Sequence, residues 1–139
     1  IAEAAEKLPL RPWTIAIERP VPGQRAVERL IRISDYAVST AGDYRNYFEQ
    51  NGQRYSHIIN PRTGRPVLQT LASVTVISKL DLQADAIDTA LMAAGADSGF
   101  QLATDHHLAA FFILASPDGK SFQERYTPEF ESFLLPQQP

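Results

Sequence analysis

The sequence contains no cysteine. Disulfide bonds, thiolate nucleophiles and thiolate metal sites are therefore excluded, and a bound metal ion would take oxygen or imidazole ligands. Long apolar stretches are missing as well, since the segment 108–115 is far shorter than the ~18–20 residues of a membrane span. An excess of positive charge is also lacking, because 13 Lys and Arg residues stand against 16 Asp and Glu residues, for a net charge of −3. This balance argues against DNA or RNA as a partner.

The composition is that of one folded domain. The 139 residues are 44% hydrophobic and 21% charged, which excludes a disordered chain. A chain of this length, within the usual ~100–150 residues, predicts a single hydrophobic core. The first residue is Ile1 and not Met, so we expect that a leader or a larger part of the protein precedes it.

Strand patterns and turn signals alternate in the first half of the chain. β-branched and aromatic residues predict strands over 13–17, 36–40, 44–49 and 54–59. The short apolar pattern over 26–33 fits a helix about as well as a strand, and we favour a strand. Asn51 and Gly52 form the typical turn of a two-residue hairpin, so the strands over 44–49 and 54–59 should pair antiparallel. The following segment 60–66 contains two prolines and a glycine and predicts a turn.

The second half predicts helices between strands. Residues 81–94 are rich in helix formers and end before Gly95. The apolar stripe of this helix should comprise Ala84, Ile87, Leu91 and Ala94. The other expected elements are a strand over 73–78, a helix over 97–104, antiparallel strands over 108–115 and 120–126, and a helical turn over 128–134. Together these elements predict an α+β fold, a mainly antiparallel sheet with helices packed on it.

Three oxygen donors come close together on the predicted helix 81–94. Asp85, Asp88 and Thr89 stand at i, i+3 and i+4, so their side chains project from neighbouring points of one face. Two carboxylates and a hydroxyl are hard ligands that suit Mg²⁺ or Ca²⁺. The alternative is that the acidic residues complement the helix dipole and that Thr89 bonds to the backbone in the core.

Histidine offers a second candidate site. His57 lies on the return strand of the hairpin, just before the proline-containing turn, and would suit a general base near neutral pH. A structural, hydrogen-bonded histidine is the alternative. His106 and His107 precede a strand and are expected on the surface.

Small residues around a glycine form a third candidate. The segment Ser-Thr-Ala-Gly-Asp at 39–43 would let the backbone approach a ligand and present donors to a phosphate, although it matches no established phosphate-binding motif. Arg62 and Arg65, in the turn after His57, would either pair with phosphate or be solvated.

Four further segments stand out in their order and spacing: STAGDYRNYF, RYSHIINPRTGRPV, SVTVI and ADAIDTALM. Together they resemble the C-terminal half of the ApbE family of FAD:protein FMN transferases, and the likeness extends from about residue 13 to residue 134. The resemblance implies a T-fold-like core and Mg²⁺-dependent transfer of FMN from FAD to a Thr or Ser hydroxyl of a target flavoprotein, with release of AMP. Two further activities stay open: hydrolysis of FAD to FMN and AMP, and flavin binding without turnover.

The family motifs imply roles for single residues. Asp85, Asp88 and Thr89 would bind the metal, and His57 would serve as base or orient the acceptor hydroxyl. The flavin nucleotide would be lined by Thr40, Gly42, Asp43, His57, Ile58 and Ile59. The chain departs from the family at Asn60, where Asp is frequent, and at Ala41, where Ser is frequent.

The family also implies a longer protein. Its members are considerably larger, and their N-terminal half supplies much of the flavin pocket, so we expect residues 1–139 to be the C-terminal portion of one flavin transferase domain, with that N-terminal half as its partner. Family members are usually periplasmic lipoproteins. We therefore expect a periplasmic protein anchored to the inner membrane by an N-terminal lipid that this chain lacks.

Overall fold

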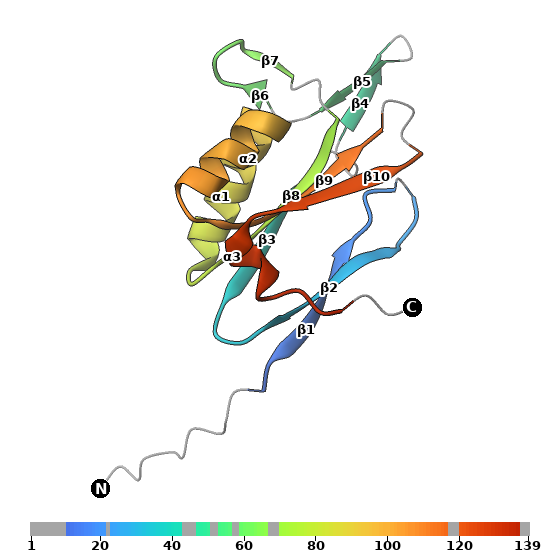
Figure 1. Ribbon diagram of the computed structural model, residues 1–139. Helices are drawn as coiled ribbons and strands as arrows, with labels where there is room; N and C mark the ends of the chain where they lie inside the picture. Colours follow the sequence, from blue (N-terminus) through green and yellow to red (C-terminus); the bar gives the residue numbers. More distant parts are fainter. Residues whose placement is uncertain are drawn as a thin grey trace, which may run out of the picture.

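The computed structural model describes residues 11–21, 23–42, 47–50, 53–56, 59–66, 70–116 and 120–136. Its strands are β1 (Trp13–Glu18), β2 (Val27–Ile33), β3 (Ala37–Gly42), β4 (Tyr47–Gln50), β5 (Gln53–Ser56), β6 (Ile59–Asn60), β7 (Arg65–Pro66), β8 (Leu71–Ser78), β9 (Ala109–Ala115) and β10 (Phe122–Tyr126). Its helices are α1 (Asp81–Ala94), α2 (Ala96–Asp105) and α3 (Pro128–Glu131). Apart from the short β6 and β7, each falls on a predicted segment, and the α+β class is confirmed (Figure 1).

A four-stranded antiparallel sheet in the order β10-β9-β8-β3 forms the middle of the fold. Strand β8 is hydrogen-bonded to β3 on one side and to β9 on the other. Every residue from Leu71 to Ile77 is buried, which agrees with its run of β-branched residues without a breaker. The strand therefore has neighbours on both edges and on both faces.

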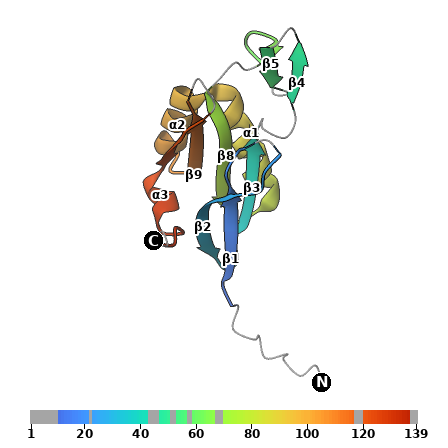
Figure 2. The ribbon, with the colours of Figure 1, turned by 90° about the vertical axis from the view of Figure 1, so that its right-hand side faces the viewer.

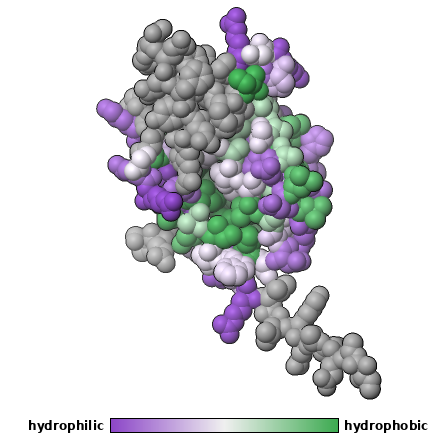
Figure 3. All heavy atoms as spheres, turned by 180° about the vertical axis from the view of Figure 1, so that it is seen from behind, coloured by the Kyte–Doolittle hydropathy of each residue, from purple (hydrophilic) through white to green (hydrophobic). Residues whose placement is uncertain are grey.

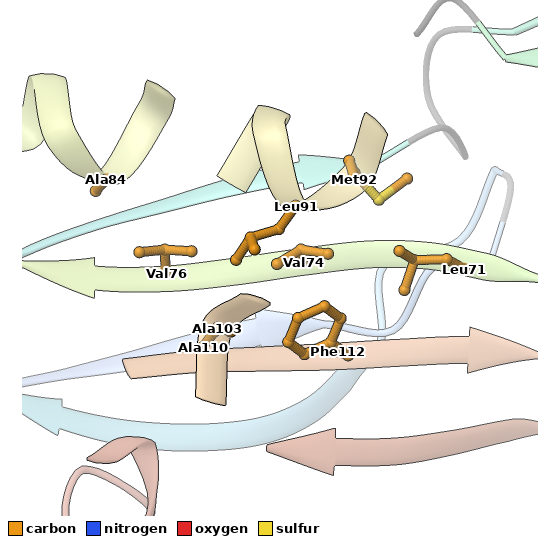
Figure 4. Close-up of a cluster of buried hydrophobic side chains, with 9 residues drawn as sticks. All are labelled: Leu71, Val74, Val76, Ala84, Leu91, Met92, Ala103, Ala110 and Phe112. Atoms are coloured by element: carbon orange, nitrogen blue, oxygen red, sulfur yellow. The ribbon is translucent and has the colours of Figure 1, made fainter. Parts of the chain in front are cut away.

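Helices α1 and α2 cover one face of this sheet. Leu71, Val74 and Val76 of β8 point toward Leu91 and Met92 of α1 (Figure 4). From β9 and α2, the same cluster receives Ala103, Ala110 and Phe112. Burial of the nine side chains of this cluster is favourable, at ~25 cal/mol per Å² of apolar surface removed from water.

The opposite face is covered by the antiparallel pair β1–β2 and by α3 (Figures 1 and 2). Phe111 and Ile113 of β9 alternate with the helix-facing Ala110 and Phe112, as the two-residue period of a strand requires. These side chains pack with isoleucines of β1 and β2 and with Phe130 of α3. The sheet thus separates two hydrophobic clusters.

An ion pair joins the β1–β2 layer to the sheet. The Arg29 Nε atom of β2 lies 2.9 and 2.8 Å from the two carboxylate oxygens of Glu124 on β10. Both side chains are largely shielded, with relative exposures of 18% and 15%. Such a forked, shielded contact is stronger than an exposed ion pair.

The predicted bounds of α1 are confirmed, but its predicted apolar stripe is partly wrong. The buried residues of α1 are Ala84, Asp88, Leu91 and Met92. Ile87 is only partly buried and Ala94 is exposed. Near the end of the helix, Met92 and not Ala94 packs in the core cluster. The helix ends at Gly95, whose positive φ of 94° leads the chain into α2.

Shorter elements lie at one end of the molecule (Figure 1). The hairpin prediction is confirmed, since β4 and β5 pair antiparallel with Gln50 opposite Gln53. Strands β6 and β7 flank the predicted turn, where the Gly64 amide donates to the Asn60 carbonyl at 2.8 Å with φ at +64°. His106 and His107 are exposed as predicted.

Apolar side chains also reach the surface. Seen from behind, they gather on the lower part of the face (Figure 3). The large apolar residues with exposed side chains in the described ranges are Trp13, Val27, Tyr36, Ile59, Leu80, Leu82 and Leu102. Among the described helices, none is long and apolar enough to pass through a bilayer.

Candidate metal and nucleotide site

Helix α1 places its three oxygen donors at different depths. The helix begins shortly after β8 and lies against β3 and β8. Asp85 and Thr89 are exposed, whereas Asp88 is 1% exposed and points into the layer between helix and sheet. The predicted triad is therefore adjacent in space but not uniform: one carboxylate is buried and two donors face solvent.

Asp88 and Thr89 are linked directly. The Thr89 hydroxyl donates to Asp88 Oδ1 at 3.1 Å, while Asp88 Oδ2 is buried and has no hydrogen-bond partner among the described residues. Burial raises the pKa of the Asp88 carboxyl above its ordinary value of 3.8, the hydroxyls of Ser39 and Thr89 act in the opposite direction, and the nearby Asp85 raises it further. The suggestion that Thr89 is a core threonine bonded to the backbone is not supported, because its side chain is exposed and bonds to a carboxylate.

Strand β3 contributes Ser39 to this layer, a residue of the candidate segment 39–43 for which the sequence predicted no contact with the acidic helix. Ser39 and Ala41 belong to the face of β3 that α1 covers: Ala41 packs against the α1 cluster, and the Ser39 hydroxyl acts on Asp88. The signal was present in the alternation of the strand, but only the position of α1 over β3 identifies Ser39 as a neighbour of Asp88.

Thr40 lies on the other face of the sheet. Its hydroxyl is 2.8 Å from that of the buried Thr75 on β8, whereas Asp88 lies on the α1 side. The strand predicted over 36–40 extends further, to Gly42, because Thr40 and Gly42 are both paired with β8 in register. Strand alternation thus separates Thr40 from the acidic helix, and its flavin-binding role stays a prediction.

Ile59 is brought close to α1. It is 48% exposed and starts β6, which lies next to α1. In the turn that follows, the Arg62 amide donates to Asn60 Oδ1 at 2.9 Å, so Asn60 shapes the turn through its side chain. Arg62 and Arg65 are exposed.

Three predicted site residues lie outside the described residues: Asp43, His57 and Ile58. Their roles stay predictions from the family resemblance. Ile59 comes directly after His57 and Ile58 in the sequence. It belongs to β6, which contacts α1.

The donor set of α1 fits Mg²⁺. In the ranges that the structure describes, no group of three or more His, Cys, Asp and Glu side chains could hold a metal ion, so the site offers at most the two carboxylates and the hydroxyl. Mg²⁺ is typically bound by one or two carboxylates and completes its octahedral shell with water and substrate phosphates. The arrangement suits an ion shared with a phosphate-containing ligand.

Sequence comparison identifies the family. The profile described as "ApbE family" matches residues 3–112. The chain belongs to the ApbE family. Two ApbE relatives are both named FAD:protein FMN transferase: the one from Vibrio cholerae is 46% identical over 123 residues, and the one from Escherichia coli K12 is 42% identical over 124 residues. These matches cover 88% and 89% of this chain but 36% and 35% of the relatives, so the chain spans about a third of their length.

Solved structures of the ApbE family are similar to this fold. The flavin transferase ApbE from Vibrio cholerae superposes with a TM-score of 0.74 at 43% identity, covering 88% of this chain and 38% of that one. An ApbE protein from Thermotoga maritima gives 0.73 at 30% identity, covering 90% and 39%. The ApbE-like fold inferred from the sequence motifs is thereby confirmed.

Proposed function

We propose that the protein carrying this chain transfers FMN from FAD to a Thr or Ser hydroxyl of a target flavoprotein, in a Mg²⁺-dependent reaction that releases AMP. The observation that carries the proposal is the combination of family membership with the oxygen donors that α1 presents toward solvent. Relatives covering most of this chain are named FAD:protein FMN transferase. A periplasmic location with a lipid anchor stays a prediction.

The residues of α1 would hold the dication. Asp85, Asp88 and Thr89 supply hard oxygen donors within one turn of the helix, next to β6 and its Ile59. When bound, Mg²⁺ neutralises charge on the diphosphate of FAD. Phosphoryl transfer requires mainly positioning and charge neutralisation, so this small set of side chains matches the chemistry.

The transfer step is balanced in atoms and in charge. The acceptor hydroxyl oxygen forms a bond to the phosphorus of the FMN half, and the bond from that phosphorus to the bridging oxygen breaks. AMP leaves with the bridging oxygen. The hydroxyl proton passes to a base, for which His57 is the predicted residue.

The test is a transfer assay with the whole protein. FAD, Mg²⁺ and a flavoprotein domain with an acceptor threonine are incubated, and the flavin fluorescence of the denatured acceptor is measured together with AMP. We expect equal amounts of attached FMN and AMP. Asp85→Asn should lower the rate at least about 100-fold, because removal of a metal ligand forfeits several kcal/mol of charge stabilisation.

Asp81→Asn is the matched control. Asp81 is an exposed aspartate in the first turn of the same helix, so the substitution makes the same change of charge, and the rate should stay within about twofold. AMP release without labelling of the acceptor would instead show an FAD pyrophosphatase. FAD binding with neither product would show a flavin-binding module without turnover.

A further inference from the structure

The turn between β6 and β7 has a backbone held by four hydrogen bonds. The Asn60 carbonyl accepts from the amides of Thr63 and Gly64, at 3.3 and 2.8 Å. Asn60 Oδ1 accepts from the Arg62 amide at 2.9 Å. The Arg65 amide donates to the Thr63 hydroxyl at 3.3 Å. Because these bonds fix the backbone that carries Arg62 and Arg65, the turn loses little conformational freedom when a ligand binds.

Both arginines of this turn present their charge to solvent. Arg62 and Arg65 are exposed, and neither forms an ion pair with a carboxylate of the described residues. Four cations elsewhere in the described ranges do pair with carboxylates: Arg19, Arg29, Lys79 and Arg125. The turn therefore carries two uncompensated positive charges, in a chain whose net charge is −3.

The turn lies beside the helix that carries the candidate metal ligands. Strand β6 contacts α1, and the β6–β7 pair lies next to the upper end of the helix layer in Figure 1. Arg32 is likewise exposed and forms no ion pair within the described ranges, but it belongs to β2, on the opposite face of the sheet. Closeness to α1 thus distinguishes Arg62 and Arg65 from Arg32.

The metal site proposed on α1 leaves the charge of a diphosphate uncompensated. The two positive charges of Mg²⁺ are balanced by the carboxylates of Asp85 and Asp88 when both are ionised. The diphosphate of FAD adds two negative charges of its own. A guanidinium group stays charged and pairs with phosphate oxygens through two parallel hydrogen bonds. Two such groups next to α1 therefore match the charge of the diphosphate.

We propose that Arg62 and Arg65 bind the diphosphate of FAD and form the anion-binding part of the site, beside the metal ligands of α1. The inference rests on the proposed function, since it concerns the same substrate. Of the two alternatives that the sequence left open for these arginines, it selects phosphate pairing over solvation. Neither arginine exchanges a proton in the transfer step, so both act through binding and charge neutralisation.

The test compares FAD with riboflavin, which has the same ring system but no phosphate. Binding of each to the whole protein is measured by quenching of flavin fluorescence without an acceptor protein, once with EDTA and once with Mg²⁺. With EDTA, the double variant Arg62→Gln/Arg65→Gln should bind FAD at least about 30-fold more weakly, because two charge-assisted hydrogen-bonded pairs are lost. Its affinity for riboflavin should stay within about twofold.

Arg32→Gln is the matched control, since it removes one exposed arginine from the other face of the sheet, and it should leave both affinities within about twofold. Arg62→Lys/Arg65→Lys should recover part of the lost FAD affinity, because the charge returns without the planar fork. Circular dichroism and the Tm of each variant check the fold.

Unchanged FAD affinity of the Gln double variant would overturn the inference and leave the transferase proposal intact. Equal losses for FAD and riboflavin would overturn it as well, because they would show a structural effect and no contact with phosphate. Absence of FAD binding by the unmodified protein, with EDTA and with Mg²⁺, would overturn the proposed function and the inference with it.

Discussion

At the scale of single residues, Asp88 stands out because a carboxyl group is buried on the sheet-facing side of α1. Burial disfavours the charged form and raises the pKa of Asp88 above 3.8, while Ser39 and Thr89 offset part of the effect. The folded protein therefore binds this proton more tightly than the unfolded chain does. Between pH 3.8 and the raised pKa, this residue's contribution to stability falls as the pH rises.

Asp88→Asn should remove that pH dependence. At neutral pH we expect the variant to be more stable by about 1 kcal/mol, because a neutral amide is less costly to bury than a charged carboxylate without full hydrogen bonding. Calorimetric unfolding between pH 4 and pH 7 gives the comparison. Asp81→Asn is the control, since Asp81 is exposed in the first turn of the same helix and its removal should leave the curve unchanged. Parallel curves for Asp88→Asn and the unmodified protein would contradict the expectation.

At the scale of elements, the close packing of α2 against α1 depends on Gly99. A Cβ atom at this position would lie 2.6 Å from the backbone carbonyl oxygen of Leu91, a contact that real side chains do not make. The neighbouring atom belongs to the helix backbone, so relief requires that one helix move away from the other. The short distance between the two helices therefore requires glycine at position 99.

Gly99→Ala should therefore destabilise the protein although alanine is the better helix former. The steric cost of overpacking, about 1–3 kcal/mol, exceeds the gain in helix propensity of ~1 kcal/mol. Ser98→Ala is the control on the same helix: Ser98 is exposed, and this change should be neutral or slightly stabilising. Urea unfolding of the two variants decides. A gain in stability for Gly99→Ala would show that the helices separate without cost.

The bounds of the helices and strands were easier to predict from this sequence than the side of each element that is buried. The Asn-Gly pair at 51–52 predicted a hairpin, and β4 and β5 do pair antiparallel. Gly95 correctly marked the end of α1, because glycine readily adopts a positive φ. The predicted stripe failed at Ala94, and the separation of Thr40 from Asp88 was not foreseen. Both depend on which layer covers which side of β3 and β8, and that is decided by contacts between distant segments.

The candidate site was predictable to the same degree. The i, i+3, i+4 spacing correctly brought Asp85, Asp88 and Thr89 together on α1, because helix geometry is local. Their depth was not predictable, since it follows from the packing of α1 on β3. The neighbourhood of Ser39 and Asp88 is therefore a finding of the structure.

At the scale of the whole molecule, the β1–β2 layer is tied to the sheet by the largely shielded pair of Arg29 and Glu124. Arg29→Met keeps the apolar stem but leaves the Glu124 carboxylate without its forked partner. We expect a loss of about 1–3 kcal/mol, the cost of a shielded group left unpaired. Differential scanning calorimetry would show it as a lower Tm.

The matched control is Lys79→Met. Lys79 pairs with Asp35 at 3.3 Å, but both side chains are mostly exposed, at 58% and 75%, and such pairs contribute little. The Met side chain also keeps an apolar contact with Tyr36, over whose ring the Lys79 amine lies. Equal effects of the two substitutions would mean that the attachment of the β1–β2 layer does not depend on the Arg29 pair.

Strand β8 has a neighbouring strand on each edge and is covered on both faces, so it should open more slowly than other parts of the described structure. Its amide protons should be among the slowest of the described residues to exchange with heavy water, because their release requires both flanking strands to part. Helix α1 starts only a short link beyond the end of β8. Helix α1, which carries Asp85 and Thr89, is thus attached to the strand that opens most slowly. Local unfolding of the outer hairpins should leave the distance between the Asp85 carboxylate and the Thr89 hydroxyl unchanged.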